Sequence, residues 1–205
     1  AFAGYMAMRS QPISDYYSES TDIAEIHSMS MEQFAYPYAE WFFGDQADKF
    51  RFAHLQEALT FVPFGVAVDE FQHICYAHPE LTPKERTYQW HLLEEKYMPW
   101  RRYENDAFME RGGYWYHKLH IYLYPFYYIN YTLTTMGAME FKKKYAEDKS
   151  IAWKDYLKLC KTGGSRSYLE TLRYANLANP FEQGSVERAC GYAEKILLEQ
   201  IAHMK

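Results

Sequence analysis

The chain has 205 residues, of which 48% are hydrophobic and 19% aromatic, and its formal net charge is −5. This length and apolar content suffice for the core of one domain, which we expect to span residues 1–205. The acidic balance argues against nucleic acid as a partner, because phosphate backbones are bound by clustered basic side chains. No apolar run is long enough to cross a membrane, so we expect no membrane partner either.

The first two elements are predicted to be helices, and the second carries carboxylates. The chain opens at Ala1–Met8 in apolar, helix-like sequence without an initiator methionine or signal peptide, which indicates a processed chain or a fragment. In the next helix, Glu19–Glu32, the side chains of Glu25 and Glu32 share one face. Isoleucines on this helix predict partial burial, and a buried carboxylate needs a cation or hydrogen-bond donors. The alternative is a solvated acidic face.

Long helical segments follow, and no segment alternates with the period of a strand. The apolar pattern predicts helices around Gln33–Phe43, Ala47–Cys75 and Tyr114–Tyr145. Pro63 and Pro125 should kink or interrupt the last two, because proline lacks the backbone N–H that a helix interior uses. The whole pattern predicts an all-α fold, a single lobe of about seven or eight helices.

Capping patterns mark several helix ends. Thr82-Pro83-Lys84-Glu85 combines an N-cap threonine, a proline in the first turn and a glutamate that completes a capping box, and Pro99 should stop this helix. Ser167–Glu170 is a second capping box and follows the Gly163-Gly164 pair. We expect this glycine pair to be a flexible point. Asn179-Pro180 predicts the start of the last helix.

The three cysteines, Cys75, Cys160 and Cys190, have neither the spacing of a disulfide framework nor that of a metal site. We therefore expect reduced thiols in the core of a cytoplasmic protein.

A second group of reactive side chains runs from His120 to Tyr131. On one uninterrupted helix, His120, Tyr124, Tyr127 and Tyr131 would line one stripe, with Tyr128 beside it. Imidazole and phenol donors are suited to stabilising a developing oxyanion. The alternative interpretation is aromatic packing around the proline in this stretch.

Four stretches resemble the oligoendopeptidase F family, the bacterial branch of the thimet-oligopeptidase-like zinc metallopeptidases: Ala1–Tyr5, Glu25–Glu32, Asp69–His73 and His120–Tyr131. The resemblance implies the C-terminal part of the catalytic domain, a multi-helix lobe of a zincin-type oligopeptidase. It implies zinc held by Glu25 and by two histidines of an H-E-x-x-H helix placed immediately before Ala1. That motif is absent from these residues, so we expect the chain to be inactive without the N-terminal remainder of the enzyme.

The resemblance also implies roles for other side chains. Glu32 would accept the free ring N–H of a zinc-binding histidine and so fix its orientation. His120 and tyrosines of its stretch would bind the scissile carbonyl and stabilise the oxyanion. The family spacing favours Tyr128 and Tyr131 for this role, whereas the helix stripe favours Tyr127 and Tyr131, so the choice between Tyr127 and Tyr128 stays open.

Short peptides are the implied substrates, and His117 and Tyr124 are candidates for binding them. Two other functions are compatible with the sequence. One is a non-enzymatic helical interaction module with a decayed site. The other is a di-iron bundle, because Glu70–His73 has the form Glu-x-x-His. Such bundles use two copies of that motif, and this chain holds one. Otherwise Glu70 and His73 should pair with each other or with a neighbouring helix end.

Overall fold

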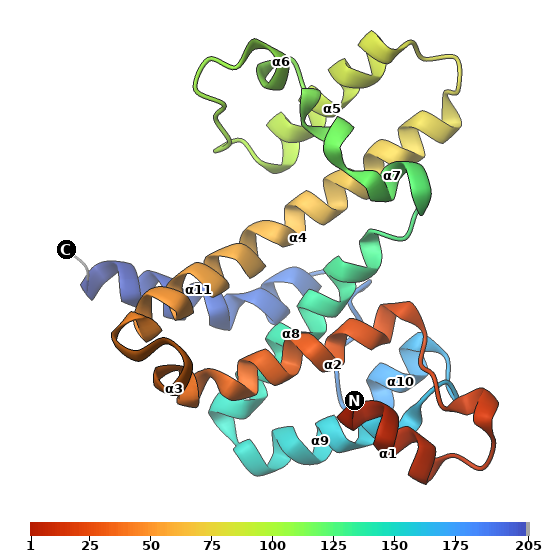
Figure 1. The fold of residues 1–205 in the computed structure, drawn as a ribbon, viewed down its shortest axis with the longest axis vertical. Helices are drawn as coiled ribbons and strands as arrows, with labels where there is room; N and C mark the ends of the chain where they lie inside the picture. Colours follow the sequence, from red (N-terminus) through yellow and green to blue (C-terminus); the bar gives the residue numbers. More distant parts are fainter. Residues whose placement is uncertain (204–205) are drawn as a thin grey trace. The chain divides into compact units, whose positions relative to one another are not determined.

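The computed structural model describes residues 1–203, and every regular element in that range is helical (Figure 1). The α-helices are α1 (Phe2–Ser10), α2 (Thr21–Ala35), α3 (Ala39–Phe43), α4 (Ala47–Ala77), α5 (Pro83–Tyr97), α6 (Ala107–Glu110), α7 (Leu119–Leu123), α8 (Ile129–Glu147), α9 (Lys149–Thr162), α10 (Tyr168–Tyr174) and α11 (Ser185–His203). Short 3-10 helices lie at η1 (Ser14–Tyr16), η2 (Tyr36–Tyr38), η3 (Gly44–Gln46) and η4 (Gly113–His117). The predicted all-α fold is confirmed.

The number of helices exceeds the predicted seven or eight because α6 and α9 were not predicted and because the segment at 114–145 is broken. The segment predicted at 33–43 divides where α2 ends, at η2 with its Pro37, and continues as α3. The segment predicted at 114–145 divides into η4, α7 and α8, so Pro125 interrupts the helix as expected. Pro63, in contrast, lies inside α4, which runs on through it.

Both predicted capping boxes are present. The backbone N–H of Thr82 donates to Glu85 Oε2 at 2.8 Å, and the Glu85 N–H donates back to the Thr82 hydroxyl. Ser167 and Glu170 form the same reciprocal pair at the start of α10. α5 ends at Tyr97, shortly before the proline expected to stop it.

The last helix begins later than predicted, at Ser185 rather than near Asn179. The reason is local: the side-chain oxygen of Asn179 accepts a hydrogen bond from the Phe181 N–H at 3.0 Å and closes a turn. Gly184 then takes a left-handed conformation, φ 76°, and the Ser185 hydroxyl donates to the Pro180 carbonyl. Asparagine and glycine favour such turns over helix.

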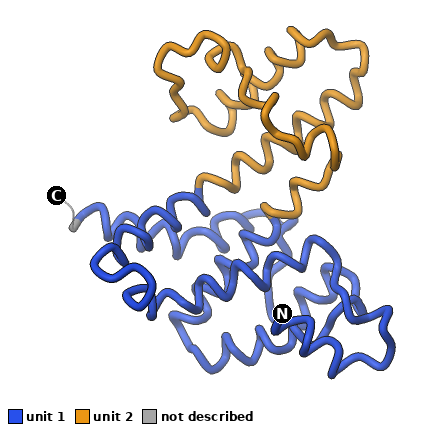
Figure 2. Tube along the Cα trace, in the orientation of Figure 1, with its two compact units in different colours: residues 1–59, 133–205 blue, residues 60–132 orange. Residues whose placement is uncertain are grey.

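The chain folds into two compact units (Figure 2). The first comprises residues 1–59 and 133–205, and the second comprises residues 60–132. Helices α4 and α8 each contribute residues to both. The expectation of one domain remains a prediction.

The core of the first unit forms around one face of α2. Ile23, Ile26 and Phe34 are buried there with Phe141 of α8 and Tyr156 of α9. The Phe34 ring meets the Phe141 and Tyr156 rings edge to face at 6.0 and 5.3 Å, a geometry that aromatic pairs prefer. Because this face is committed to the core, the carboxylates of α2 are left on its flank.

The core of the second unit is aromatic. Phe64 and Phe71 of α4 are buried with Trp90 of α5, Trp115 of η4 and Tyr128. The Phe71 and Trp90 rings pack edge to face at 5.4 Å. This cluster sets the position of the chain that leads into α8, where the reactive group of tyrosines lies.

The glycine pair after α9 is a close contact and not the flexible point expected. Gly163 is left-handed, φ 49°, and a Cβ there would lie 2.0 Å from the Tyr16 carbonyl oxygen. The Gly164 N–H donates to that same oxygen at 3.1 Å. The pair therefore fixes the loop between α1 and α2 against the end of α9.

Cys160 and Cys190 are buried free thiols, and Cys75 is a half-buried one. Burial raises the pKa of Cys160 and of Cys190 to about 11, so both stay protonated near neutral pH. Within residues 1–203, none of the helices has the length and apolar character needed to span a bilayer.

Candidate active site

Glu25 lies on the flank of α2, in the wall of a hollow of about 550 Å³ that Ala1–Gly4 also line. Its carboxylate is half-buried, and the Ser28 hydroxyl donates to its Oε2 at 2.6 Å. A serine one turn ahead in the helix thus fixes the orientation of the carboxylate. The zinc register predicted from the sequence places the preceding helix beside Glu25, and α1 and Glu25 do share this hollow. The metal-binding role itself remains a prediction.

Glu19 and His27 also line the hollow, although neither was expected to be a ligand. His27 is buried: its ring packs on Tyr156, and its Nδ1 and Nε2 lie 3.8 Å from Cys160 Sγ and Glu19 Oε1. Burial lowers the pKa of His27, although Glu19 acts in the opposite direction.

The fit of these residues to a zinc ion is therefore partial. In the described part of the chain, no three His, Cys, Asp or Glu side chains form a group that could hold a metal ion. A structural or catalytic zinc needs at least three protein ligands, and among the described residues that line this hollow Glu25 is the carboxylate that a neighbouring hydroxyl orients.

Glu32 binds a histidine of this chain. Its Oε2 lies 2.9 Å from His54 Nε2, and His54 Nδ1 lies 2.6 Å from the Tyr36 hydroxyl. The predicted partner of Glu32 was a zinc-binding histidine and not this residue of α4, so the predicted role of Glu32 remains a prediction. His54 could not be selected from the sequence, because the contact joins α2 to α4, and η2, α3 and η3 lie between these helices in the chain.

The residues His120, Tyr124, Tyr127 and Tyr131 do not lie on one helical stripe, so that expectation was wrong. α7 ends at Leu123 and α8 begins at Ile129. Proline 125 cannot donate a helical hydrogen bond, and Phe126 after it is left-handed with φ 60°. Because the helix is broken here, helix periodicity does not explain how these four side chains meet.

Nevertheless, the break brings the predicted rings together in the second unit. The centroid of His120 lies 5.0 Å from Tyr128, 6.0 Å from Tyr131 and 6.4 Å from Tyr127. Tyr131 is perpendicular to both His120 and Tyr127, and its centroid is 5.4 Å from that of Tyr127. One imidazole and three phenols therefore form a single cluster, which we call the His120 cluster.

Burial separates the two tyrosines between which the sequence left a choice. Tyr128 is 6% exposed and packs against Phe64, and its hydroxyl lies 3.3 Å from Lys118 Nζ. Burial raises the pKa of Tyr128 to about 12. Tyr127 is half-buried and stacks almost parallel to His120, with 4° between the rings. Tyr127 is therefore the more accessible of the two side chains, and the role of either in binding a substrate remains a prediction.

The two candidate substrate-binding residues lie at different places. Tyr124 is 60% exposed, and its ring meets Tyr127 at 6.3 Å, so it borders the His120 cluster. His117 is exposed, its Nδ1 is hydrogen-bonded to the Tyr114 carbonyl, and its ring packs on Tyr114. These contacts link His117 to Tyr114 rather than to the His120 cluster.

Gln72 was not selected from the sequence, yet it fixes the break before α8. Its side chain is 1% exposed, its Oε1 accepts from the Phe126 N–H at 2.8 Å, and its Nε2 donates to the Val68 carbonyl at 3.1 Å. The only signal in the sequence is a polar residue directly after Phe71, on a helix whose neighbouring face is apolar.

The Glu-x-x-His motif is engaged elsewhere. Both oxygens of Glu70 accept from Lys96 Nζ, at 2.8 and 2.9 Å, and Tyr97 also donates to Glu70 at the end of α5. These hydrogen bonds, that of Lys96 first, lower the pKa of Glu70. His73 pairs with Asp69 at 3.3 Å. Glu70 thus meets a neighbouring helix end, as expected, and a lysine-neutralised carboxylate is a poor start for a di-iron site.

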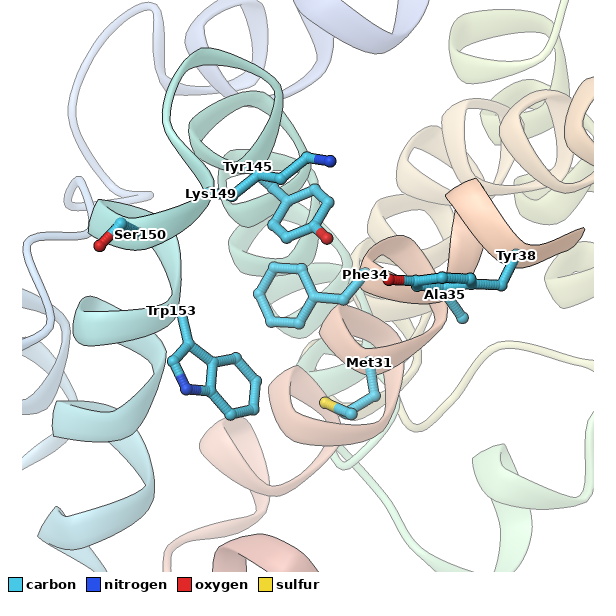
Figure 3. Close-up of a pocket in the computed structure, with 8 residues that line it drawn as sticks. All are labelled: Met31, Phe34, Ala35, Tyr38, Tyr145, Lys149, Ser150 and Trp153. Atoms are coloured by element: carbon cyan, nitrogen blue, oxygen red, sulfur yellow. The ribbon is translucent and has the colours of Figure 1, made fainter.

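A separate pocket of about 640 Å³ lies on the first unit (Figure 3). Phe34, Tyr145 and Trp153 surround it, with Lys149 and Ser150 on one side. Its lining contains no carboxylate or imidazole, so it offers neither a metal ligand nor a general base.

Comparison with known proteins identifies the class. Residues 4–191 match the profile of peptidase family M3, and the chain belongs to that family. A solved structure named oligoendopeptidase F is 48% identical with a TM-score of 0.89, over 96% of this chain and 35% of its own. The resemblance inferred from the sequence is thereby confirmed. No curated protein matches the chain.

Two further solved structures are similar. PZ peptidase A, solved with an inhibitor, is 46% identical with a TM-score of 0.90, over 97% of this chain and 35% of its own. An oligoendopeptidase F from Bacillus anthracis is 40% identical with a TM-score of 0.79, over 97% of this chain and 32% of its own. The chain thus spans about a third of the length of the structures it matches.

Proposed function

We propose that this chain forms part of a zinc-dependent endopeptidase that hydrolyses short peptides. Membership of peptidase family M3 supports the peptide-cleaving function. The observation that carries the metal assignment is Glu25, a half-buried carboxylate oriented by Ser28 in a hollow that the start of the chain lines. The three free thiols agree with a cytoplasmic location, which belongs to this proposal.

In this proposal Glu25 is the one zinc ligand that these residues supply. A bound zinc ion would supply Lewis-acid polarisation of a peptide carbonyl and of the attacking water. The two histidine ligands and the general base would come from outside the 205 residues, in the N-terminal remainder of the enzyme. Glu32 would hold an imidazole in position through its carboxylate, as it holds His54 here.

The His120 cluster is proposed to bind the substrate carbonyl. His120, Tyr127 and Tyr131 are half-buried and can present N–H and O–H donors that strengthen as the carbonyl oxygen gains charge. Tyr128 supports them from the core, where its ring packs at 5.5 Å from Tyr131 and its hydroxyl meets Lys118. Tyr124, which borders the cluster, and His117 are proposed to contact the peptide.

The test uses the complete enzyme that contains this chain, with zinc measured by elemental analysis and turnover by cleavage of a quenched fluorescent peptide. Glu25→Gln should lose zinc and turnover together. Tyr131→Phe should keep its zinc and lose about a hundred- to a thousand-fold in kcat, the usual cost of one oxyanion donor. The 205-residue chain alone should show neither zinc nor turnover until its N-terminal remainder is added.

Matched controls separate these effects from general damage. Glu187→Gln changes an exposed carboxylate of α11, and Tyr88→Phe changes an exposed phenol of α5. Both should leave zinc content and turnover unchanged. Full zinc occupancy in Glu25→Gln would contradict the ligand assignment, and an unchanged kcat in Tyr131→Phe would contradict the oxyanion role. Zinc or turnover in the isolated chain would contradict the proposal that the zinc site is shared between this chain and the N-terminal remainder of the enzyme.

A further inference from the structure

Three side chains of the first unit form a hydrogen-bonded row that ends at Glu32. His54 Nε2 lies 2.9 Å from Glu32 Oε2, and His54 Nδ1 lies 2.6 Å from the Tyr36 hydroxyl oxygen. Both distances are within the range of good hydrogen bonds, and the one to a carboxylate is charge-assisted. The row joins α4, which carries His54, to α2, which carries both Glu25 and Glu32.

The two contacts together define which ring nitrogen of His54 carries the hydrogen. An ionised carboxylate only accepts, so Nε2–H donates to Glu32. In the neutral ring Nδ1 is then an acceptor, and the Tyr36 hydroxyl donates to it. Burial, followed by the charge of Glu32, raises the pKa of Tyr36, so this hydroxyl keeps its proton. The hydrogen bonds therefore run in one direction, from Tyr36 through His54 to Glu32.

The imidazole of His54 is held by packing as well as by hydrogen bonds. Its side chain is 21% exposed. The ring stacks on Phe50, one turn earlier in α4, with 5.3 Å between the centroids and 19° between the planes. Phe50 in turn stacks on Phe43 at 4.1 Å. Rotation of the imidazole would break the stack and both hydrogen bonds, so its orientation is fixed.

Tyr36 is held from two sides. The buried side chain of Lys142 covers its ring, with Nζ 3.3 Å from the ring centroid, and Lys142 is 7% exposed. Arg51 of α4 donates to the Tyr36 carbonyl at 2.9 Å. The hydroxyl that directs His54 is therefore itself fixed in place.

Glu32 is the exposed member of the row, and one of its oxygens is unused. Its side chain is 55% exposed. Within residues 1–203 its hydrogen bond is made through Oε2, which leaves Oε1 open to another donor. Exposed ion pairs contribute little to stability. The ordering of two inner side chains around one outer carboxylate is therefore better explained by what its second oxygen accepts.

We propose that His54 is a positioning residue for the metal site: it holds Glu32 so that Oε1 can accept the ring N–H of a zinc-binding histidine. This inference rests on the proposed function, in which that histidine belongs to the N-terminal remainder of the enzyme. Glu32 lies two turns after Glu25 on the same face of α2. One carboxylate would thus bridge two imidazoles, one from each part of the enzyme, and fix the orientation of the zinc ligand.

Two substitutions at position 54 separate the N–H donor from the ring. His54→Phe keeps a flat ring that can stack on Phe50 but has no donor, whereas His54→Gln loses the ring and keeps an amide N–H that can reach Glu32. Zinc affinity of the complete enzyme is measured by competition with a chelator, and zinc dissociation by transfer to an indicator dye. His54→Phe should weaken zinc binding about tenfold, the lower end of the range for residues behind a metal ligand. His54→Gln should restore affinity close to that of the wild type.

Two controls separate positioning from general damage. His78→Phe removes another histidine that contacts a glutamate, with Nδ1 3.2 Å from Glu80 Oε1 in the second unit, and should leave zinc affinity unchanged. In a Glu32→Ala background His54→Phe should cause no further loss, because His54 acts through the carboxylate of Glu32. A residue that supports only the fold would lower zinc affinity in both backgrounds. Thermal unfolding of the zinc-free variants measures any such loss directly.

The outcomes distinguish this inference from the proposed function. Wild-type zinc affinity in His54→Phe, or an equal loss in the Glu32→Ala background, would overturn the positioning role. Equal loss in His54→Phe and His54→Gln, matched by a lower midpoint of zinc-free unfolding, would overturn it too. Retention of zinc in Glu25→Gln would refute the proposed ligand, and the measurements at position 54 would still decide whether His54 acts through Glu32.

Discussion

The clearest prediction concerns Gln72, the side chain that holds the break before α8. In Gln72→Leu the Phe126 N–H loses its acceptor at 2.8 Å, while the leucine fills most of the same space. A donor left without its partner in a partly buried place costs about 1–3 kcal/mol. Phe126 is also left-handed, which disfavours a non-glycine residue by about 1–2 kcal/mol and makes the segment depend on this bond.

We expect Gln72→Leu to lower the free energy of unfolding by about 1–3 kcal/mol in urea titrations. Hydrogen exchange of the Phe126 amide should accelerate by about 5- to 150-fold, the factor that corresponds to this energy. The matched control is Gln89→Leu, a half-buried position on α5 in the same unit, which should change stability by less than about 0.5 kcal/mol. Unchanged protection of the Phe126 amide in Gln72→Leu would refute the reasoning.

Three further predictions concern stability and are measured by urea unfolding. Gly65→Ala should cost about 1–3 kcal/mol, because its Cβ would lie 1.9 Å from Thr132 Oγ1. Thr82→Ala should cost about 1 kcal/mol through loss of the cap to Glu85. Burial lowers the pKa of Lys142 in the folded chain from its ordinary 10.5 to about 7, so between these two pH values the unfolded chain binds one proton more than the folded chain. The free energy of unfolding of the wild type should therefore rise with pH over that range. Lys142→Met should lack this contribution.

Matched variants serve as controls for these measurements. Gly191→Ala adds the same methyl group to α11, where nothing lies within 4 Å, and should be neutral or stabilising. If Gly65→Ala were as stable as the wild type, the helices that carry Gly65 and Thr132 would separate without a cost in free energy, and the prediction would be wrong. Ser167→Ala should repeat the loss seen for Thr82→Ala, because both residues cap through the same reciprocal pair. Identical pH profiles for Lys142→Met and wild type would mean that Lys142 keeps an ordinary pKa.

The two prolines show what sequence could and could not establish about the fold. Helix content and capping boxes depend on neighbouring residues, so they were predicted correctly. Pro63 and Pro125 carry the same local penalty, yet only Pro125 ends a helix. The residues beside Pro63, Val62 and Phe64, are 4% and 7% exposed, so packing on both sides holds α4 together. Tyr124 beside Pro125 is 60% exposed and offers no such support.

The candidate site likewise contains some features that the sequence predicts and others that it does not. The oriented carboxylate of Glu25 and the gathering of rings around His120 follow from residues that the sequence already singled out. The contact of Glu32 with His54 joins α2 to α4, and the hydrogen bond from Phe126 to Gln72 joins residues far apart in the chain. Such partners depend on how helices pack, which no local pattern contains.

Lys142 shows most directly what a local sequence pattern cannot predict. It stands first in a run of three lysines, Lys142-Lys143-Lys144, which reads as a solvated basic segment. On α8 these three side chains point in directions about 100° apart, so one can enter the core while the next stays in water. Which one does so is decided by Tyr36 and its surroundings, and these come from a different part of the chain.

The contact of Gly163 and Gly164 with the loop before α2 has a consequence for genetic screens. That loop runs into Tyr17, Ser18 and Glu19, which form part of the wall around Glu25. A methyl group at either glycine would push against the carbonyl oxygens of Tyr16 or Ser18 and displace that wall. A search for alleles that disable the Glu25 hollow should therefore recover positions 163 and 164, although neither residue has a side chain to take part in any reaction.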